Sequence, residues 1–215
     1  MKILKPNIAG KPEIISDLLQ LIELSKIEEI PITTMHFQGI TLVDEDISKI
    51  YFKESIFENC RFINCLFPKC DFTDVIFTSC DLSNCDLSDT CLSRCQFISC
   101  KAVGINLINS SLLHLSVQNS NFNYANFGNA RLKNICLSES DLSYANIAEC
   151  KITNLEFDNV KLINASFFKT PLKGIDFTKS QIDGIAVSGE ELQGAIVSAY
   201  QAADLAKLLG LIVKG

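Results

Sequence analysis

The sequence lacks most of the residues and patterns on which enzymes depend. It has only two histidines, His36 and His114, and neither lies near a carboxylate or a thiol in a recognisable catalytic arrangement. It contains no glycine-rich phosphate loop, no HExxH or GxSxG motif and no paired set of metal ligands. We therefore predict a protein that is not an enzyme and that uses no cofactor, metal or small-molecule substrate.

Positive charge and long apolar runs are also scarce. The chain has 19 Lys and Arg against 25 Asp and Glu, and its net charge of −6 argues against direct nucleic-acid binding through a basic patch. No apolar stretch is long enough to cross a bilayer. Lys5 and Pro6 interrupt the short apolar start, which is a poor match to a signal peptide. We expect a cytoplasmic protein that does not bind membranes.

What the chain does have is a five-residue repeat. Thirteen of its 14 phenylalanines occupy one register, which runs from Phe37 to Leu192 and contains 32 positions ((192 − 37)/5 + 1), all of them apolar. A helix turns about 140° in five residues, at about 100° per residue, and would scatter these side chains. On a flat strand, an odd step would place successive positions on opposite faces. The pattern predicts a solenoid, in which the chain turns a corner every five residues.

A second column supports the same register. Two residues before each register position, from Cys60 to Ile185, the 26 occupants ((185 − 60)/5 + 1) are only Cys, Val, Thr, Ile, Ser, Leu and Ala. Eight of the ten cysteines lie in this thin column, whereas Cys91 and Cys136 take outward positions. The C-x4-C spacing does not match a zinc site. We predict buried, reduced thiols that serve packing, with a metal or redox role as the alternative.

Individual segments resemble a known family. CDFTD (70–74), CDLSN (80–84), ANFGN (125–129), SDLSY (140–144) and IDFTK (175–179) are similar to the A(D/N)LXX pattern of the pentapeptide repeat family. The resemblance covers roughly residues 35–194. It implies an all-β fold, a right-handed quadrilateral parallel β-helix with four pentads per coil and about eight coils. The predicted division is an N-terminal cap (1–34), the β-helix (35–194) and a C-terminal helix with a short strand (195–215).

The two ends depart from the repeat. Near Lys11 to Ser25, Pro12 and the apolar spacing predict a helix that caps the first coil. At the other end, Ser198 can begin a helix that stops at Gly210, before a short strand. This apolar tail is either a cap over the last coil or a symmetric dimer joint. The predicted dimer residues are Leu205, Leu208, Leu209, Leu211, Ile212 and Val213.

The tail also resembles that of one subgroup. LQGAIVSAYQAADLAKLLGLIVKG (192–215) is similar in layout to the C-terminus of Qnr-type quinolone-resistance proteins. The resemblance implies an acidic, rod-shaped homodimer that imitates duplex DNA, binds the type II topoisomerases DNA gyrase and topoisomerase IV, and protects them from fluoroquinolones. Plasmid-borne members carry projecting loops, but the register here is unbroken. Binding would therefore depend on the shaft and its charge.

Charges can be sorted by face, because residues 20 apart should stack. The face that contains Phe57, Phe77 and Phe157 carries five acids against Lys179, a net charge of −4 (1 − 5), and the next face, through Phe72, is basic. The five predicted partner-binding residues are Glu58, Glu139, Glu156, Asp158 and Asp176. This acidic face could follow a cationic groove on an enzyme, or it could be ordinary solvated surface. The alternative function is a non-enzymatic scaffold that binds another cytoplasmic protein.

Overall fold

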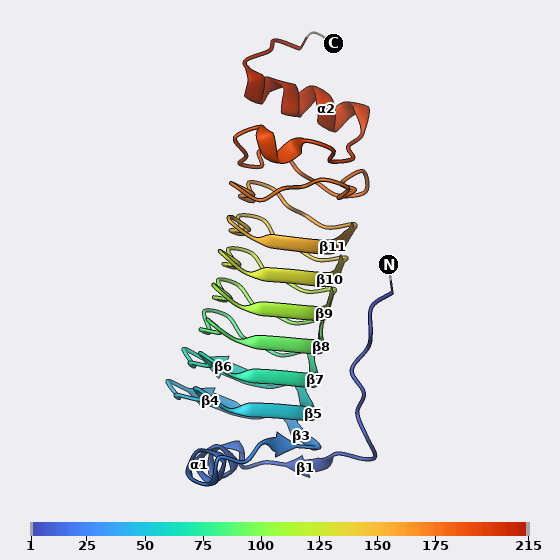
Figure 1. The fold of residues 1–215 in the computed structure, drawn as a ribbon. Helices are drawn as coiled ribbons and strands as arrows, with labels where there is room; N and C mark the ends of the chain where they lie inside the picture. Colours follow the sequence, from blue (N-terminus) through green and yellow to red (C-terminus); the bar gives the residue numbers. More distant parts are fainter. Residues whose placement is uncertain (1, 214–215) are drawn as a thin grey trace.

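The protein is a parallel β-solenoid, a shaft of about seven stacked turns, about one fewer than predicted, with a helix at each end (Figure 1). The structure is a computed structural model. It describes residues 2–213, except for the side chain of Leu209. Strands of the main sheet follow the order β1-β3-β5-β7-β8-β9-β10-β11, and every pair is parallel. Phe57 pairs with Phe77, and Arg131 pairs with Lys151. This offset of 20 residues confirms four pentads per coil.

The strands are short near the N-terminus and then settle into a repeating length. The short strands are β1 (Glu13–Ile15), β2 (Ile32–Thr33), β3 (Met35–Gln38), β4 (Thr41–Val43) and β6 (Arg61–Ile63). The long strands are β5 (Tyr51–Glu58), β7 (Asp71–Thr78), β8 (Cys91–Ile98), β9 (Ser111–Gln118), β10 (Arg131–Ser138) and β11 (Lys151–Asp158). The helices are α1 (Leu18–Glu28), α2 (Ala199–Ala206) and two 3₁₀ turns, Glu190–Leu192 and Lys207–Leu209.

Each long strand turns a corner at its fourth residue. That residue has a left-handed backbone, with φ between 51° and 60°, which is unusual for residues other than glycine and asparagine. Stacked over one another, these residues form what we call the corner column: Glu54, Asp74, Arg94, His114, Asn134 and Asn154. The same left-handed turn recurs every five residues, often at Asn, and it is what folds a repetitive sequence into a square-sectioned coil.

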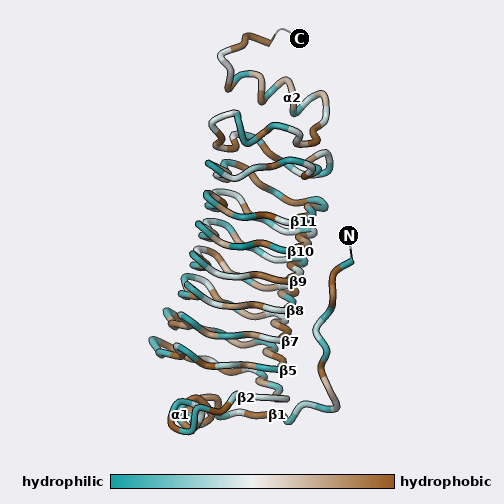
Figure 2. Tube along the Cα trace, viewed as in Figure 1, coloured by the Kyte–Doolittle hydropathy of each residue, from teal (hydrophilic) through white to brown (hydrophobic). Residues whose placement is uncertain are grey.

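The two predicted columns form the interior. All residues of the five-residue register are buried except Ile152, Val187 and Leu192, which are partly buried. The thin column is buried throughout, from Cys60 to Ile185. Around each coil, apolar and polar residues alternate (Figure 2). Aromatic rings stack from coil to coil, with centroids 4.9 Å apart for Phe57–Phe77 and 4.7 Å apart for Phe77–Phe97.

The cysteines lie where the repeat places them. All ten are free thiols, the eight in the thin column are buried, and Cys91 is exposed. Seven of the eight buried Sγ atoms donate to backbone carbonyls of the preceding coil, as from Cys70 to Ile47 O at 3.0 Å and from Cys150 to Phe127 O at 3.0 Å. The thiols therefore fill the narrow part of the interior and satisfy main-chain acceptors.

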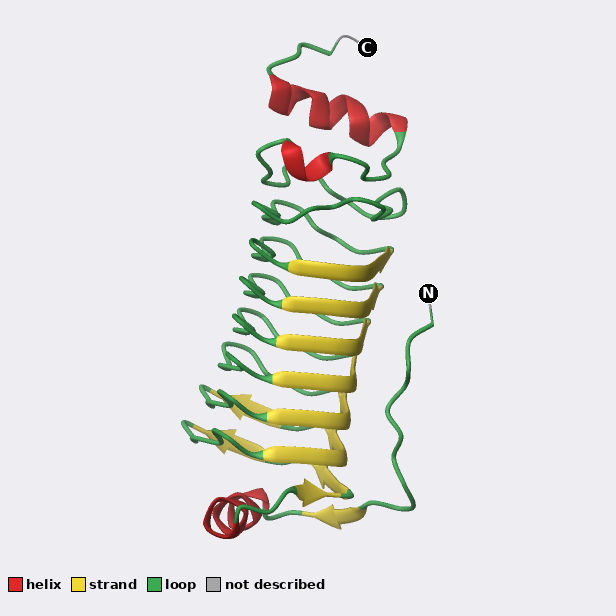
Figure 3. Cartoon of the chain, viewed as in Figure 1, coloured by secondary structure: helices red, strands yellow, loops and turns green. Residues whose placement is uncertain are grey.

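The N-terminal end differs from the prediction. Helix α1 begins at Leu18, seven residues after Lys11 (18 − 11), because Asp17 supplies the N-cap by accepting from Gln20 N–H at 3.1 Å. Pro12 instead precedes β1, which pairs with β3 at the first coil. Residues 2–12, which we call the strap, run as an extended segment beside the shaft (Figure 3). Nothing in the repeat pattern predicted this path.

The C-terminal helix follows the prediction more closely. Ser198 caps α2 and forms a capping box with Gln201, and Gly210 has φ of 75° after the final 3₁₀ turn. The buried Gln201 side chain donates to Phe177 O and to Ser180 O, both at 2.8 Å. These bonds fix α2 over the last coil. In the single chain, residues 211–213 form no strand.

A candidate protein-binding face

Four of the five predicted acids lie together on the upper part of the shaft. Glu156 and Asp158 are two residues apart on β11 and project to the same side. Asp176 lies one coil above Glu156, and Glu139 directly follows β10. Glu139, Glu156 and Asp176 are exposed, and Asp158 is half-buried. We call these four residues the acidic patch.

Neighbouring groups orient the side chains of the patch. The Lys179 ammonium lies 3.2 Å from Asp158 Oδ1, and the Asn159 side chain donates to Glu139. The Thr178 N–H donates to Asp176 Oδ1 at 2.8 Å, and hydrogen bonds from Thr178 hold the pKa of Asp176 below its usual value. With Lys179 included, the patch carries a net charge of −3 (1 − 4).

Three residues of the acidic patch, Glu156, Asp158 and Asp176, line a shallow depression. Its volume is about 370 Å³, and it is open to solvent along one side. The residues that line it are Asn154, Leu155, Glu156, Phe157, Asp158, Gly174, Asp176 and Lys179. A depression of this shape and sign suits a cationic side chain of a macromolecular partner better than an enclosed small ligand.

Glu58, the fifth predicted residue, is not part of the patch. It lies on β5, four coils below Ser138, so that about 19 Å separates the two at about 4.8 Å per coil. Its Oε2 lies 2.8 Å from His36 Nε2. The uncharged residues Thr78, Ile98 and Gln118 stand between it and the patch. Sorting charges by face therefore placed Glu58 on the same side of the shaft as the patch but did not show that it stands apart along the axis.

Across the corner column, the upper coils are basic. Arg131 and Lys151 are register neighbours on β10 and β11, and Lys133 lies on the same exposed side. Strands β10 and β11 therefore carry basic side chains before the corner residue and are followed, beyond that corner, by residues of the acidic patch. At the corner itself, the Asn154 side chain donates to Asn134 Oδ1 at 2.8 Å.

One acidic residue near the patch was missed by the sequence analysis. Asp141 follows Glu139 around the next corner, and both line a second open depression of about 480 Å³ that also includes Lys161. Its position could have been found by considering adjacent faces together, because only one residue separates the two acids in the chain.

The predicted dimer residues divide into two groups. Leu205 packs partly buried against the core, as expected for a cap. The side chains of Leu208, Leu211, Ile212 and Val213 are exposed, with Ile212 reaching 89%. The side chain of Leu209 lies outside the described residues. The tail therefore closes the last coil and still presents apolar surface.

Comparison with known families agrees with this architecture. Two overlapping segments, residues 70–147 and 116–187, match the model described as "Pentapeptide repeat region". Together they cover 118 of the 215 residues (187 − 70 + 1). This chain belongs to the pentapeptide repeat family. Among curated proteins, none matches the chain.

Solved pentapeptide repeat structures resemble the shaft. A trypsin-treated form of QnrB1, a plasmid-mediated fluoroquinolone resistance protein, is 23% identical, with a TM-score of 0.56, over 84% of this chain and 100% of its own. HetL, involved in heterocyst differentiation regulation in the cyanobacterium Nostoc sp. strain PCC 7120, is 16% identical, with a TM-score of 0.46, over 81% of this chain and 92% of its own. The structural match to QnrB1 shows a shared fold.

Two further properties concern the described part of the chain. Neither α1 nor α2 is long and apolar enough to cross a membrane. Among residues 2–213, no group of three or more His, Cys, Asp or Glu side chains is arranged to hold a metal ion.

Proposed function

We propose that this pentapeptide repeat protein binds a type II topoisomerase, DNA gyrase or topoisomerase IV, as a DNA mimic and protects it from fluoroquinolones. The acidic patch carries the proposal, and the likeness of the fold to QnrB1 supports it. In this role the patch takes the place of DNA phosphates in a cationic groove of the enzyme.

The density of charge in the patch is lower than that of DNA. Its four acids occupy three successive coils, which take up about 14 Å of the axis at about 4.8 Å per coil. That is roughly one negative charge per 3.6 Å, or one per 4.8 Å with Lys179 included, against one per 1.7 Å of duplex axis. The mimicry is local, because the coils below β10 carry only Glu58 on this face.

The exposed tail supports a homodimer. Leu208, Leu211, Ile212 and Val213 form an apolar end next to α2, and a two-fold joint there would bury them and double the length of the shaft. Sedimentation equilibrium of the full chain tests this part of the proposal. Leu208→Glu with Ile212→Glu should convert a dimer into a monomer, and a wild-type monomer at micromolar concentration would contradict it.

A supercoiling assay tests topoisomerase protection. Purified gyrase is inhibited with ciprofloxacin, and the full-length protein is added over a range of ratios. We expect recovery of supercoiling. The triple variant Glu139→Lys, Glu156→Lys and Asp158→Lys should require at least tenfold more protein for the same recovery, because charge reversal at a complementary interface costs several kcal/mol.

A matched control separates the patch from net charge. Glu23→Lys, Glu28→Lys and Asp89→Lys change the net charge equally, at exposed positions on α1 and on a lower coil. This variant should protect as the wild type does. If both triple variants lose protection equally, the effect comes from overall charge and not from the patch.

The second candidate is a scaffold for a different protein partner. It is favoured by the uninterrupted register, since no loop projects from the coils within residues 35–187. If the protein restores the activity of neither drug-inhibited gyrase nor drug-inhibited topoisomerase IV, at any ratio, the scaffold function is the one supported. Affinity capture with the wild type and with the patch variant would then show whether the acidic patch recognises that partner.

A further inference from the structure

The strap makes an unusual contact with the corner column. Asn7 N–H donates to Asp74 Oδ1 at 3.0 Å, and Leu4 N–H donates to His114 Nδ1 at 3.3 Å. Both donors belong to the backbone of the strap, and both acceptors are side chains of the shaft. The recognition therefore depends on an extended main chain more than on particular strap side chains.

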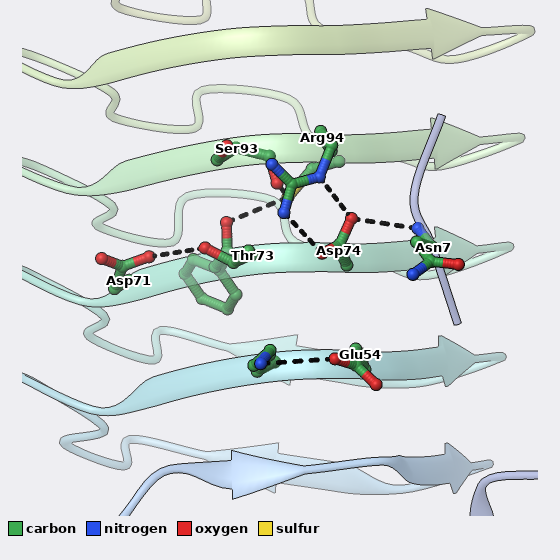
Figure 4. A network of polar contacts seen from close by, with 10 residues as sticks. Asn7, Glu54, Asp71, Thr73, Asp74, Ser93 and Arg94 are labelled. Atoms are coloured by element: carbon green, nitrogen blue, oxygen red, sulfur yellow. Dashed lines mark hydrogen bonds and ion pairs between the residues drawn. The ribbon is translucent and has the colours of Figure 1, made fainter. Parts of the chain in front are cut away.

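Asp74 is built to receive such a donor. It is only 4% exposed, and Arg94 holds it through Nε to Oδ1 at 2.7 Å and through Nη2 to Oδ2 at 2.6 Å (Figure 4). Burial raises the pKa of Asp74, but the bonds from Arg94 and from Asn7 N–H outweigh it, and the pKa lies below its usual value. A fixed, buried carboxylate thus faces the strap.

The spacing of the two contacts matches an extended chain. Leu4 and Asn7 are three residues apart, which is about 10 Å at about 3.3 Å per residue. Asp74 and His114 are two coils apart, which is about 9.6 Å at about 4.8 Å per coil. An extended peptide along the shaft can therefore place the N–H groups of residues three apart against corner-column residues two coils apart.

The strap itself is weakly held and positively charged. Lys2, Leu4, Lys5 and Asn7 are exposed, while Ile3, Pro6 and Ile8 are only half-buried. Residues 2–12 contain three lysines and no acid, in a chain whose net charge is −6. The strap runs from β1 up to the level of β9 and β10 (Figure 1). The first residue of the acidic patch, Glu139, directly follows β10.

We propose that the corner column is a binding surface for an extended, lysine-bearing segment of a partner protein, and that the strap is its intramolecular occupant. The strap covers Asp74 and His114 in the isolated molecule, and a partner segment of the same chemistry replaces it. Asn134 and Asn154 continue the column beyond the last hydrogen bond of the strap, at His114, and lead to the acidic patch. A partner segment longer than the strap would bind both surfaces.

Peptide competition on the full chain tests this exchange. The probe is a fluorescein-labelled peptide with the sequence of residues 2–12, and its binding is followed by fluorescence anisotropy. Leu4→Pro with Asn7→Pro removes both N–H donors from the strap without shortening the chain. Loss of two hydrogen bonds should weaken the tethered strap, and the probe should bind this variant roughly tenfold more tightly than the wild type.

Three controls identify the site and the chemistry. Ala9→Pro, at an exposed strap residue whose N–H makes no hydrogen bond within the described residues, should bind the probe as the wild type does. A probe with proline at the positions of Leu4 and Asn7 should bind the double variant at least tenfold more weakly. A probe with its lysines replaced by glutamate should also bind more weakly, most clearly at low salt.

Several results would overturn the proposal. Equal probe affinity for the wild type and for the Leu4→Pro, Asn7→Pro variant would show that the strap and the probe do not compete. A proline-containing probe that binds as tightly as the unmodified one would exclude recognition through the backbone N–H groups. Absence of binding to the double variant, with its circular dichroism spectrum unchanged, would show that the corner column holds no peptide in trans.

Discussion

Phe77 offers the sharpest measure of what holds the shaft together. Its side chain is 2% exposed, and its ring stacks between Phe57 and Phe97 at 4.9 and 4.7 Å, with interplanar angles of 11° and 9°. Replacing a buried Phe by Ala costs about 3–5 kcal/mol in lost burial and cavity formation. Each aromatic pair adds about 0.5–1.5 kcal/mol beyond burial. We therefore expect Phe77→Ala to lower the free energy of unfolding by about 4–8 kcal/mol.

The assay is equilibrium urea unfolding followed by far-UV circular dichroism. Phe77→Leu is the informative companion, because Leu137 occupies the same column in a later coil. We expect it to cost about 1.5 kcal/mol, since most of the volume and apolar area is retained. Thr78→Ala, on the outer side of the same strand, should change stability by less than about 0.5 kcal/mol.

The slope of the unfolding free energy against urea concentration reports how cooperatively the coils unfold. Each coil contacts only its neighbours, so damage to one coil can separate the unfolding of the two halves. A lower slope in Phe77→Ala would indicate this loss of cooperativity. A cost below about 1 kcal/mol with an unchanged slope would refute the conclusion that stacked rings carry the stability of this end of the shaft.

Three further predictions concern other parts of the shaft. An apolar void of about 20 Å³ lies beside Val117, where smaller aliphatic residues replace the Phe stack, and Val117→Ile should raise stability in urea by about 0.5 kcal/mol. The pKa of Asp74 in the folded protein lies below its usual 3.8. Its pairing with Arg94 therefore stabilises the fold above pH 3.8, and this stabilisation is lost as the pH falls through the pKa of Asp74 in the folded state. Arg94→Gln should cost more stability at about pH 6 than at about pH 2.5. Cys91 should react with a thiol reagent at pH 8 before Cys70, which is buried and whose pKa burial raises to about 12, and equal rates in the native protein would contradict the packing.

The candidate site could be predicted only in part. Once residues 20 apart are known to stack, Glu156 and Asp176 must be neighbours, and the side of the shaft that carries the acids follows. The repeat pattern did not show how far Glu58 lies from the acidic patch along the axis of the shaft. It also did not show that Glu58 pairs with His36. It also treated each face separately and so missed Asp141, which approaches Glu139 around a corner.

The sequence by itself determined the shaft, because a five-residue apolar register leaves the backbone only one way to keep Phe and the thin column inside. It also determined the cap of α2, since Ser198 and Gln201 lie within one turn of each other. Only the tertiary structure decided the course of the strap. Its contacts join residues 67 and 110 positions apart in the chain, and they use backbone donors that every residue except proline possesses. No local sequence pattern predicts such a contact, and only the folded structure shows that Asp74 is buried beneath the strap.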